Sequence, residues 1–256
     1  MIVKTCGLRK LLNIQSIYEL DINWIGLIFY QKSPRFVGGH EDLLPFLEKE
    51  KTPKRVGVFV NETFASILET VSRYQLDYVQ LHGGESAVYC STLKRMMAED
   101  LDREVGVIRA FRVSRAFDFA VTVDYEPFCD YFIFDTKAPQ VYGGTGHKFD
   151  WSVLDRYEGK TPFLLSGGIG PDDAKAVLEV THPALAGVDL NSRFEIEPGL
   201  KDVELLRSFI DELKNKLSIA QSNKSKLESN KEDISDEHSK LTSSLNQLNL
   251  DVEKIV

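Results

Sequence analysis

The sequence predicts an α/β fold, a closed (βα)8 TIM barrel, and three observations support this prediction. Eight short apolar segments recur through about the first 210 residues, at the spacing of alternating strands and helices. Each segment is hydrophobic almost without interruption, as strands buried on both faces are. Polar or glycine-rich residues follow several of these segments, and a closed parallel barrel gathers the C-terminal ends of its strands around one pocket.

The apolar segments, rich in β-branched residues, are the expected strands. They span residues 2–5, 24–29, 56–60, 78–81, 105–111, 131–134, 163–165 and 185–190. Apolar residues with helical spacing lie between them, at Ile14, Ile17 and Tyr18, then Leu43, Leu44 and Leu47, then Ile67, Leu68 and Val71. The segment 171–178 opens with a proline and two aspartates, as helix starts do.

The alternative architecture is an open, doubly wound sheet. Such a sheet binds its ligand at a switch point and usually carries a GxGxxG turn after its first strand. Here the residues at 6–9 read Cys-Gly-Leu-Arg, and the glycine clusters at 83–84, 143–146 and 167–170 lack that spacing too. Eight units over about 210 residues therefore favour the barrel.

Composition and charge exclude several classes of protein. The 256 residues carry a formal net charge of −8, which argues against a protein that binds nucleic acid through its phosphates. No apolar run reaches the roughly 18 residues of a membrane span, and the N-terminus does not read as a signal peptide. We therefore expect a cytoplasmic protein with no membrane partner.

The cysteines point to the same compartment. Cys6, Cys90 and Cys129 are widely spaced and odd in number, which indicates free thiols rather than a disulfide framework. The sequence has no CxxC pair and no His/Cys cluster with the spacing of a zinc site. We therefore expect no bound metal.

Short motifs occur in a fixed order along the chain. They are KTCG at 4–7, KSPR at 32–35, VGVFVN at 56–61, VQLHG at 79–83, GGTG at 143–146 followed by FDW at 149–151, and SGG at 166–168. As an ordered set they resemble the phosphoribosylanthranilate isomerase family, over about residues 1–213. The resemblance implies a (βα)8 barrel without a cofactor. It also implies the Amadori rearrangement of N-(5-phosphoribosyl)anthranilate, a phosphorylated aminosugar, to 1-(2-carboxyphenylamino)-1-deoxyribulose 5-phosphate in tryptophan biosynthesis.

Two titratable residues at strand ends suit this reaction. Opening the sugar ring needs an acid at the ring oxygen, and the shift from aldose to ketose needs a base at C2. Cys6 suits the base, because nearby cationic or N–H donors lower the pKa of a thiol from about 8.5. Asp135 suits the acid, because the apolar strand before it raises the pKa of a carboxyl group. By resemblance, these positions match the family's general base and general acid.

Both assignments have a structural alternative. A cysteine in an apolar strand is more often a small core residue, as we expect for Cys90 and Cys129. Cys6 differs because a glycine follows it at a strand end, on the face where barrel chemistry gathers. An aspartate after a strand is often only the cap of the next helix or turn, which is the alternative for Asp135.

A glycine-rich segment follows Asp135 closely and contains Gly143, Gly144 and Gly146. We interpret it as a lid that closes over the pocket and excludes water, which favours Asp135 as the acid. The alternative is that these glycines only turn the chain.

Three further residues are candidates for binding the organic part of the substrate. Arg35 follows a Ser-Pro turn, where a guanidinium group can bind a carboxylate through two hydrogen bonds. By resemblance, Arg35 holds the anthranilate carboxylate and Asp189 contacts the sugar hydroxyls. His82 lies in the family's Leu-His-Gly motif and lines the same pocket. A solvated arginine and a structural histidine are the alternatives.

The phosphate site is expected in the loops after the seventh and eighth strands, at Gly167, Gly168, Asn191 and Ser192. Glycine lets backbone N–H groups approach an oxyanion, and a short helix terminus adds a favourable dipole. The family commonly has Asp-Val-Ser-Ser-Gly-Val-Glu here, whereas Arg193 stands in place of its glycine. Our hypothesis is that Arg193 contacts the phosphate; the alternative is that it points to solvent.

The C-terminal extension, residues 216–256, differs from the barrel, which we place at 1–215. From about residue 218 it has no aromatic, glycine or proline residue, so it cannot extend the barrel core. Apolar residues recur every seven positions, at Leu213, Ala220, Leu227, Ile234, Leu241, Leu248 and Ile255, and Leu245 and Val252 add a second seam. Lys224, Lys231 and His238 interrupt that second seam. A disordered segment or a marginal single helix is therefore favoured over a stable coiled coil. We expect a monomer or a homodimer, with the extension as the candidate for self-association.

Two other functions were weighed against the isomerase. One is a non-catalytic barrel that acts as an interaction scaffold through its C-terminal extension. The other is a related sugar-phosphate isomerase on the same fold. The presence of Cys6, Asp135, Arg35 and the glycine-rich segment in one chain favours the phosphoribosylanthranilate isomerase over both alternatives.

Overall fold

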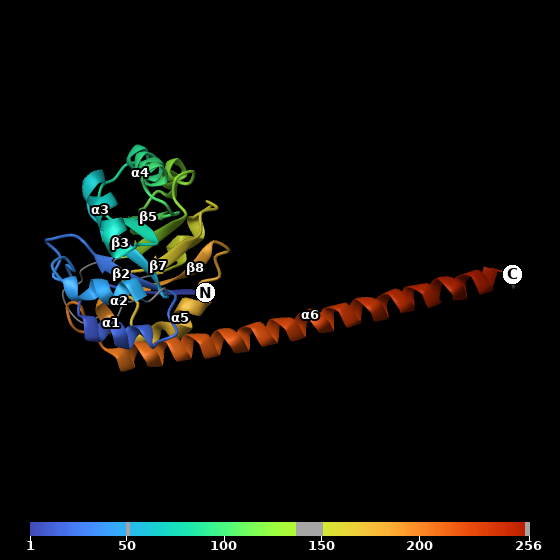
Figure 1. The fold of residues 1–256 in the computed structure, drawn as a ribbon. Helices are drawn as coiled ribbons and strands as arrows, with labels where there is room; N and C mark the ends of the chain where they lie inside the picture. The colour runs from blue at the N-terminus through green and yellow to red at the C-terminus, as the bar shows by residue number, and fades with distance from the viewer. Residues whose placement is uncertain (50–51, 137–150, 254–256) are drawn as a thin grey trace. The chain divides into compact units, whose positions relative to one another are not determined.

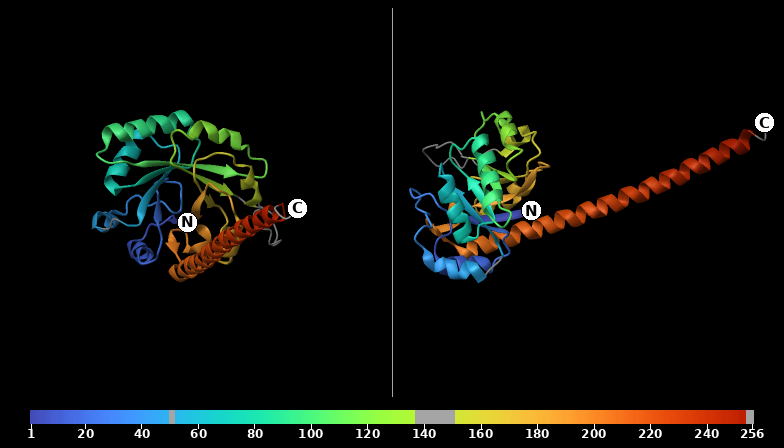
Figure 2. Two further views of the ribbon diagram at one scale, coloured as in Figure 1. Left: turned by 90° about the vertical axis from the view of Figure 1, so that its right-hand side faces the viewer. Right: turned by 45° about the horizontal axis from the view of Figure 1, so that its top comes forward.

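The computed structural model describes residues 1–49, 52–136 and 151–253, and it confirms the predicted barrel. Eight parallel strands close on themselves in sequence order, inside a ring of helical segments (Figures 1 and 2). The strands are β1 (Ile2–Cys6), β2 (Trp24–Ile28), β3 (Lys54–Phe59), β4 (Tyr78–Leu81), β5 (Gly106–Val113), β6 (Tyr131–Thr136), β7 (Phe163–Ser166) and β8 (Leu185–Leu190). The predicted segments differ from these bounds by at most a few residues.

The pairing of β1 with both of its neighbours closes the barrel and sets the register around the first strand. Cys6 is level with Gly26 of β2, and Lys4 is level with Asp189 of β8. Lys4 and Cys6 stand two positions apart, so their side chains project from the same face of β1. Because all strands run parallel, their C-terminal ends meet at one mouth of the barrel.

Within the described ranges, the α-helices that connect the strands are α1 (Leu11–Tyr18), α2 (Leu44–Lys49), α3 (Phe64–Tyr74), α4 (Ala87–Asp100) and α5 (Ala174–Glu179). The side chains of Thr63 and Ser86 cap α3 and α4 by accepting hydrogen bonds from backbone N–H groups. The helix expected at 171–178 begins as a 3-10 turn, η4 (Pro171–Asp173), before it continues as α5.

Two 3-10 segments cover the sixth strand: η2 (Phe119–Tyr125) and η3 (Trp151–Arg156). Phe134 of β6 packs against the rings of Phe119, Tyr157 and Phe163. These aromatic side chains are large enough to bury the outer face of β6 beneath short segments.

Apolar side chains fill the lower part of the barrel interior, leaving its C-terminal mouth to polar residues. The interior cluster consists of Trp24, Val56, Ile108, Ala110, Ile133 and Leu164. The rings of Tyr78 and Tyr131 pack against Trp24, with centroids 4.7 and 5.0 Å from it. The barrel is therefore a packed core rather than a pore, and a ligand site is confined to the mouth.

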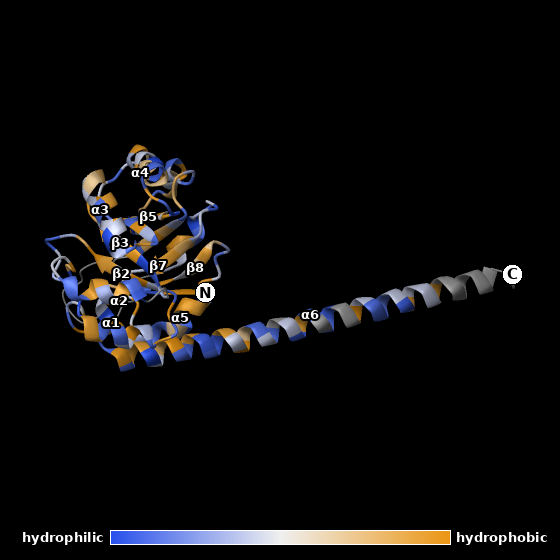
Figure 3. Cartoon of the chain, in the orientation of Figure 1, coloured by the Kyte–Doolittle hydropathy of each residue, from blue (hydrophilic) through white to orange (hydrophobic). Residues whose placement is uncertain are grey.

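The chain divides into two compact units, Met1–Ile210 and Asp211–Val256. A single helix, α6 (Val203–Glu253), begins in the first unit, where Leu206, Phe209 and Ile210 are buried. In the second unit the chain is helical as far as Glu253, so the helical alternative for the extension is the one observed. Hydrophobic residues recur among hydrophilic ones along the coloured part of this helix (Figure 3). Within the described residues, no helix is long and apolar enough to cross a membrane.

Candidate active site

A cavity of about 720 Å³ opens at the C-terminal mouth of the barrel. It is lined by nearly all of the residues singled out from the sequence: Cys6, Arg35, His82, Asp135, Gly167, Gly168, Asp189, Asn191, Ser192 and Arg193. Gly143, Gly144 and Gly146 lie outside the described residues. Cys6 on β1 and Asp135 on β6 thus face one cavity, although 129 positions separate them in the sequence.

Cys6 lies in a tight space at the end of β1, with only 4% of its surface exposed. Gly26 of β2 is level with it, and a Cβ atom on Gly26 would lie 2.6 Å from the Cys6 sulfur. A glycine at this position is therefore required to leave room for the thiol.

Lys4 is a buried neighbour of Cys6 that the sequence analysis did not single out. Its ammonium group is fully buried and lies 2.9 Å from Oδ1 of Asp189. The positive charge of this group also acts on the thiol of Cys6 and favours its thiolate form by lowering its pKa. The Lys4–Asp189 ion pair stands directly below the cavity and fixes a positive charge next to the sulfur.

Burial raises the pKa of the Cys6 thiol above its ordinary value. The ammonium groups of Lys4 and Lys201 oppose this effect, whereas the carboxylate of Asp189 adds to it. This direction is opposite to the one expected from the residue type, because desolvation in the narrow barrel outweighs the nearby cations. Two lysines beside the thiol nevertheless make a thiolate accessible to chemistry.

Asp135 stands at the edge of the cavity, close to His82. The Nε2 atom of His82 is 3.6 Å from Oδ2 of Asp135. On its other side, the Nδ1 atom of His82 lies 2.9 Å from the amide nitrogen of Gln80, which is buried on β4. Since an amide nitrogen only donates, Nδ1 accepts and the Nε2 atom carries its proton toward Asp135. Gln80 thus orients the imidazole.

Arg35 enters the cavity from the loop after β2 and is held by a carboxylate. Its Nε and Nη2 atoms lie 2.8 and 2.5 Å from the two carboxylate oxygens of Glu195. Gly7 has φ +81°, and a Cβ atom there would lie 2.7 Å from Cδ of Arg35. The glycine after Cys6 therefore serves both the turn at the end of β1 and the close passage of the arginine.

Two consecutive glycines after β7 have left-handed backbone conformations, with φ +91° at Gly167 and +74° at Gly168. A Cβ atom on Gly168 would meet nothing within 4 Å, so conformation rather than space requires glycine there. Arg193, in the turn η5 (Ser192–Phe194), lies beside this loop: its Nε is 3.6 Å from where a Cβ of Gly170 would stand. The residue that departs from the family pattern is thus adjacent to the glycine loop.

Sequence reasoning missed four charged or polar residues at or beneath the cavity: Lys4, Gln80, Glu195 and Lys201. Lys4 could have been found as a lysine two positions before Cys6 on the same face of an apolar strand. Gln80 stands in the same relation to His82 on β4. Glu195 and Lys201 carry no such signal, because their partners Arg35 and Asn191 lie in other elements.

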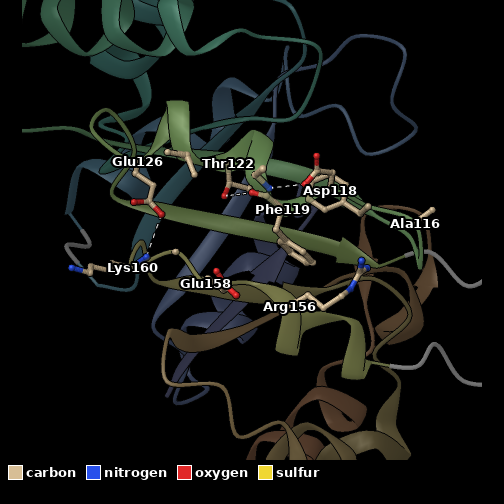
Figure 4. A pocket seen from close by; sticks show the side chains of 12 residues that line it. Ala116, Asp118, Phe119, Thr122, Glu126, Arg156, Glu158 and Lys160 are labelled. Atoms are coloured by element: carbon tan, nitrogen blue, oxygen red, sulfur yellow. Dashed lines mark hydrogen bonds between the residues drawn. The ribbon is translucent and has the colours of Figure 1, made fainter.

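A second hollow, of about 870 Å³, lies between η2 and the segment after η3 (Figure 4). Among its charged side chains, Glu126 accepts a hydrogen bond from the backbone N–H of Lys160, and Arg156 lies over the ring of Phe119. None of the predicted site residues that the structure describes lines it. The catalytic assignments therefore concern the barrel mouth.

The model of the family described as N-(5'phosphoribosyl)anthranilate (PRA) isomerase matches residues 3–212 of the chain. The chain belongs to the N-(5'-phosphoribosyl)anthranilate isomerase family. It is 49% identical to the isomerase of Parabacteroides distasonis over 214 residues, which is 83% of this chain and 93% of that protein.

Solved structures of the N-(5'-phosphoribosyl)anthranilate isomerase family share the barrel. The Thermotoga maritima enzyme is 35% identical, with a TM-score of 0.68 over 84% of this chain and all of its own. A further structure from Thermotoga maritima is of monomers generated from the dimeric isomerase. Another isomerase structure, 32% identical with a TM-score of 0.66 over 84% of this chain and 100% of that one, contains reduced 1-(o-carboxyphenylamino)-1-deoxyribulose 5-phosphate.

Proposed function

We propose that the chain catalyses the Amadori rearrangement of N-(5'-phosphoribosyl)anthranilate, with Cys6 as general base and Asp135 as general acid. The observation that carries the proposal is that these two groups, Arg35 and the glycine loop at 167–168 all line one cavity at the barrel mouth. Membership of the isomerase family supports this reaction over the scaffold and over another sugar-phosphate isomerase.

The two groups have distinct tasks. Asp135 donates a proton to the ring oxygen while the C1–O bond breaks and the anilino nitrogen forms an iminium ion with C1. The thiolate of Cys6 then removes the proton from C2, and the electron pair of the C–H bond neutralises the iminium nitrogen. The resulting enol becomes the ketose when C1 gains a proton and the C2 hydroxyl loses one. Hydrogen atoms only change place within the substrate, so the chemistry requires no redox cofactor.

Lys4 supports the base in this scheme. The charge of its buried ammonium group compensates part of the desolvation that opposes the thiolate. Asp189 holds Lys4 in place from β8, and its position in the cavity wall supports a contact to the sugar hydroxyls as well.

The cavity has a place for each end of the substrate. We assign the anthranilate carboxylate to Arg35 and the phosphate to the backbone of Gly167 and Gly168 together with Asn191, Ser192 and Arg193. Left-handed glycines turn successive N–H groups toward one side, which is how backbone concavities bind anions. His82, between the two ends, positions Asp135.

The reaction is tested by following the loss of anthranilate-type fluorescence with freshly prepared substrate. Wild type, Cys6→Ser and Asp135→Asn are compared at one pH. Because general acid or base catalysis contributes about 10²–10⁴-fold, each variant should lose at least about 100-fold in kcat. Equal rates in all three proteins would remove both proposed roles.

We also propose that the extension pairs with a second copy of this chain. The side chains of Leu227, Ile234 and Leu241 lie on one seven-residue seam and are each at least 64% exposed. In a parallel pair of helices, Lys231 would lie next to Lys231 of the second copy, and His238 next to its His238. An antiparallel pair places both residues beside apolar residues of the other helix. The charge pattern therefore supports an antiparallel pair.

This assembly is tested with the full chain by sedimentation. Ile234→Asp places a charge on the seam and should convert a dimer to a monomer. Ile219→Asp is the matched control, because Ile219 is also exposed but lies off the seam. A monomeric wild type, or a dimer that survives Ile234→Asp, would remove the proposal.

The three free cysteines support a reducing compartment, and we propose the cytoplasm.

A further inference from the structure

A hairpin that follows the last barrel strand closes around Arg35. Strands β9 (Glu195–Glu197) and β10 (Leu200–Lys201) pair antiparallel, and Glu195 stands opposite Lys201. The turn between them contains Pro198 and Gly199, and Gly199 has φ +86°. Proline followed by a left-handed glycine is the sequence of a type II turn. The hairpin therefore presents Glu195 and Lys201 side by side.

Glu195 is enclosed by hydrogen-bond donors. Its Oε1 accepts from Nε of Arg35 at 2.8 Å, from Nζ of Lys201 at 2.8 Å and from the backbone N–H of Gly199 at 3.1 Å. Its Oε2 lies 2.5 Å from Nη2 of Arg35, and the side chain is 4% exposed. Burial acts to raise the pKa of Glu195, but hydrogen bonds from Arg35 and Lys201 outweigh it and hold the pKa below its ordinary value.

Lys201 anchors this carboxylate. Its fully buried ammonium group also donates to the carbonyl and the side-chain oxygen of Asn191, at 3.1 and 2.8 Å, so its three N–H groups are all used. The side chain of Asn13 on α1 binds the backbone N–H and C=O of Lys201. Lys201 thus holds the carboxylate of Glu195 in place, so Glu195 does not move together with Arg35.

The contact with Glu195 uses only one edge of the guanidinium group, Nε and Nη2. Five N–H groups are available on an arginine, so those of Nη1 and one of Nη2 are left. Among the described residues, none accepts a hydrogen bond from Nη1. Arg35 lines the cavity and keeps 20% of its side chain exposed. The remaining edge has the fork geometry that binds a carboxylate.

We infer that Glu195 is a positioning residue: it holds one edge of Arg35 so that the other edge faces the carboxylate on the aromatic half of the substrate. The inference rests on the proposed function, in which Arg35 binds that carboxylate. Lys201 matters for charge as well as for anchoring. Arginine and glutamate together are neutral, and the lysine leaves the cluster one net positive charge with which to attract an anion.

The test compares two ligands that differ only in the carboxylate. One is reduced 1-(o-carboxyphenylamino)-1-deoxyribulose 5-phosphate, and the other carries a phenylamino group in its place. Binding is measured by calorimetry on the full chain. In Glu195→Gln the amide oxygen can still accept from Lys201 and Gly199, while its NH₂ group replaces an acceptor of Arg35.

Glu195→Gln should weaken the carboxylate ligand about tenfold, because Arg35 must then be ordered at each binding event. The phenylamino ligand should change by less than about twofold. Glu197→Gln is the matched control, since Glu197 lies on the same strand but is exposed and pairs with Lys10. It should leave both ligands within about twofold of wild type.

Equal weakening of both ligands by Glu195→Gln would show a purely structural role and overturn the inference, as would no weakening of either. Arg35→Lys provides a second arm, because lysine lacks the fork. Arg35→Lys should likewise weaken the carboxylate ligand but not the phenylamino ligand. Adding Glu195→Gln to Arg35→Lys should weaken neither ligand further. A wild type that binds both ligands equally would instead refute the proposed role of Arg35 itself.

Discussion

The two halves of the active site differ in how tightly the protein holds them. Cys6 is almost fully buried above the Lys4–Asp189 ion pair, whose charged atoms lie 2.9 Å apart. Asp135 is 16% exposed, and Nε2 of His82 lies 3.6 Å from its Oδ2. Fixed charges inside the barrel therefore control the base, whereas the acid lies at the rim, open to an arriving substrate. Changes on the base side should cost stability as well as rate.

Lys4→Met is the strongest test of this difference. It leaves Asp189 without its partner in a buried site, which costs about 3–5 kcal/mol of folding stability. It also removes a cation beside Cys6, and kcat should fall at least about 100-fold. Urea unfolding and the fluorescence assay measure the two effects. Lys4→Met combined with Asp189→Asn should regain stability but not activity; full activity in either protein would contradict the scheme.

The pH profile reports the state of the buried thiol. Because burial raises the pKa of Cys6 above its ordinary value, kcat/KM should rise about tenfold per pH unit up to the raised pKa. The pKa of the Cys6 thiol is higher in the folded than in the unfolded state, so the thiol contributes to folding stability at pH values below its ordinary pKa. This stability is lost as pH rises through the folded-state pKa. Thermal unfolding measures it. Cys6→Ser lacks the thiol. If this variant loses as much stability above about pH 9 as wild type does, the loss comes from a group other than Cys6.

His82→Asn should affect rate without affecting stability. At 3.6 Å the contact with Asp135 is longer than a hydrogen bond, so we expect kcat to fall only about fivefold while the unfolding midpoint changes little. His40→Asn is the control, because His40 is a similarly exposed histidine outside the cavity. A loss of stability on the scale of Lys4→Met would show that the acid half is held as tightly as the base half.

Arg193→Ala should have the smallest effect. Arg193 is exposed beside the glycine loop, so its removal should raise KM about threefold at low salt, and the increase should shrink at high salt. Arg95→Ala on α4 controls for the loss of an exposed arginine elsewhere. An unchanged KM at low salt would eliminate the contact between Arg193 and the phosphate.

The local pattern of apolar residues was enough to predict the barrel and those cavity residues that lie at the end of a strand. Cys6 and Asp135 follow apolar runs directly, and the closed topology brings such positions together wherever they lie in the sequence. Short helices and 3-10 segments were less predictable. The aromatic contacts of Phe134 with Phe119 and Tyr157, which replace a regular helix over β6, come from residues far apart in sequence.

The charged network around the site was not predictable from local pattern, because its pairs span most of the chain. Arg35 and Glu195 are 160 positions apart, and Lys4 and Asp189 are 185 apart. Neither pairing can be recognised from the residues next to either partner in the sequence. The direction of the Cys6 pKa was missed for a related reason, since burial depends on Gly26 and on neighbouring strands rather than on the residues next to it.

The separation of Lys4 from Asp189 also affects how the molecule is made. A nascent chain acquires Asp189, the second charge of this buried pair, only after about three quarters of the polypeptide has been synthesised. Until then the lysine of the first strand has no counterion and must stay hydrated, so β1 cannot be sealed into a closed wall. Biosynthesis therefore ends with the first and last strands meeting, and fragments split between them should regain activity only when both halves assemble.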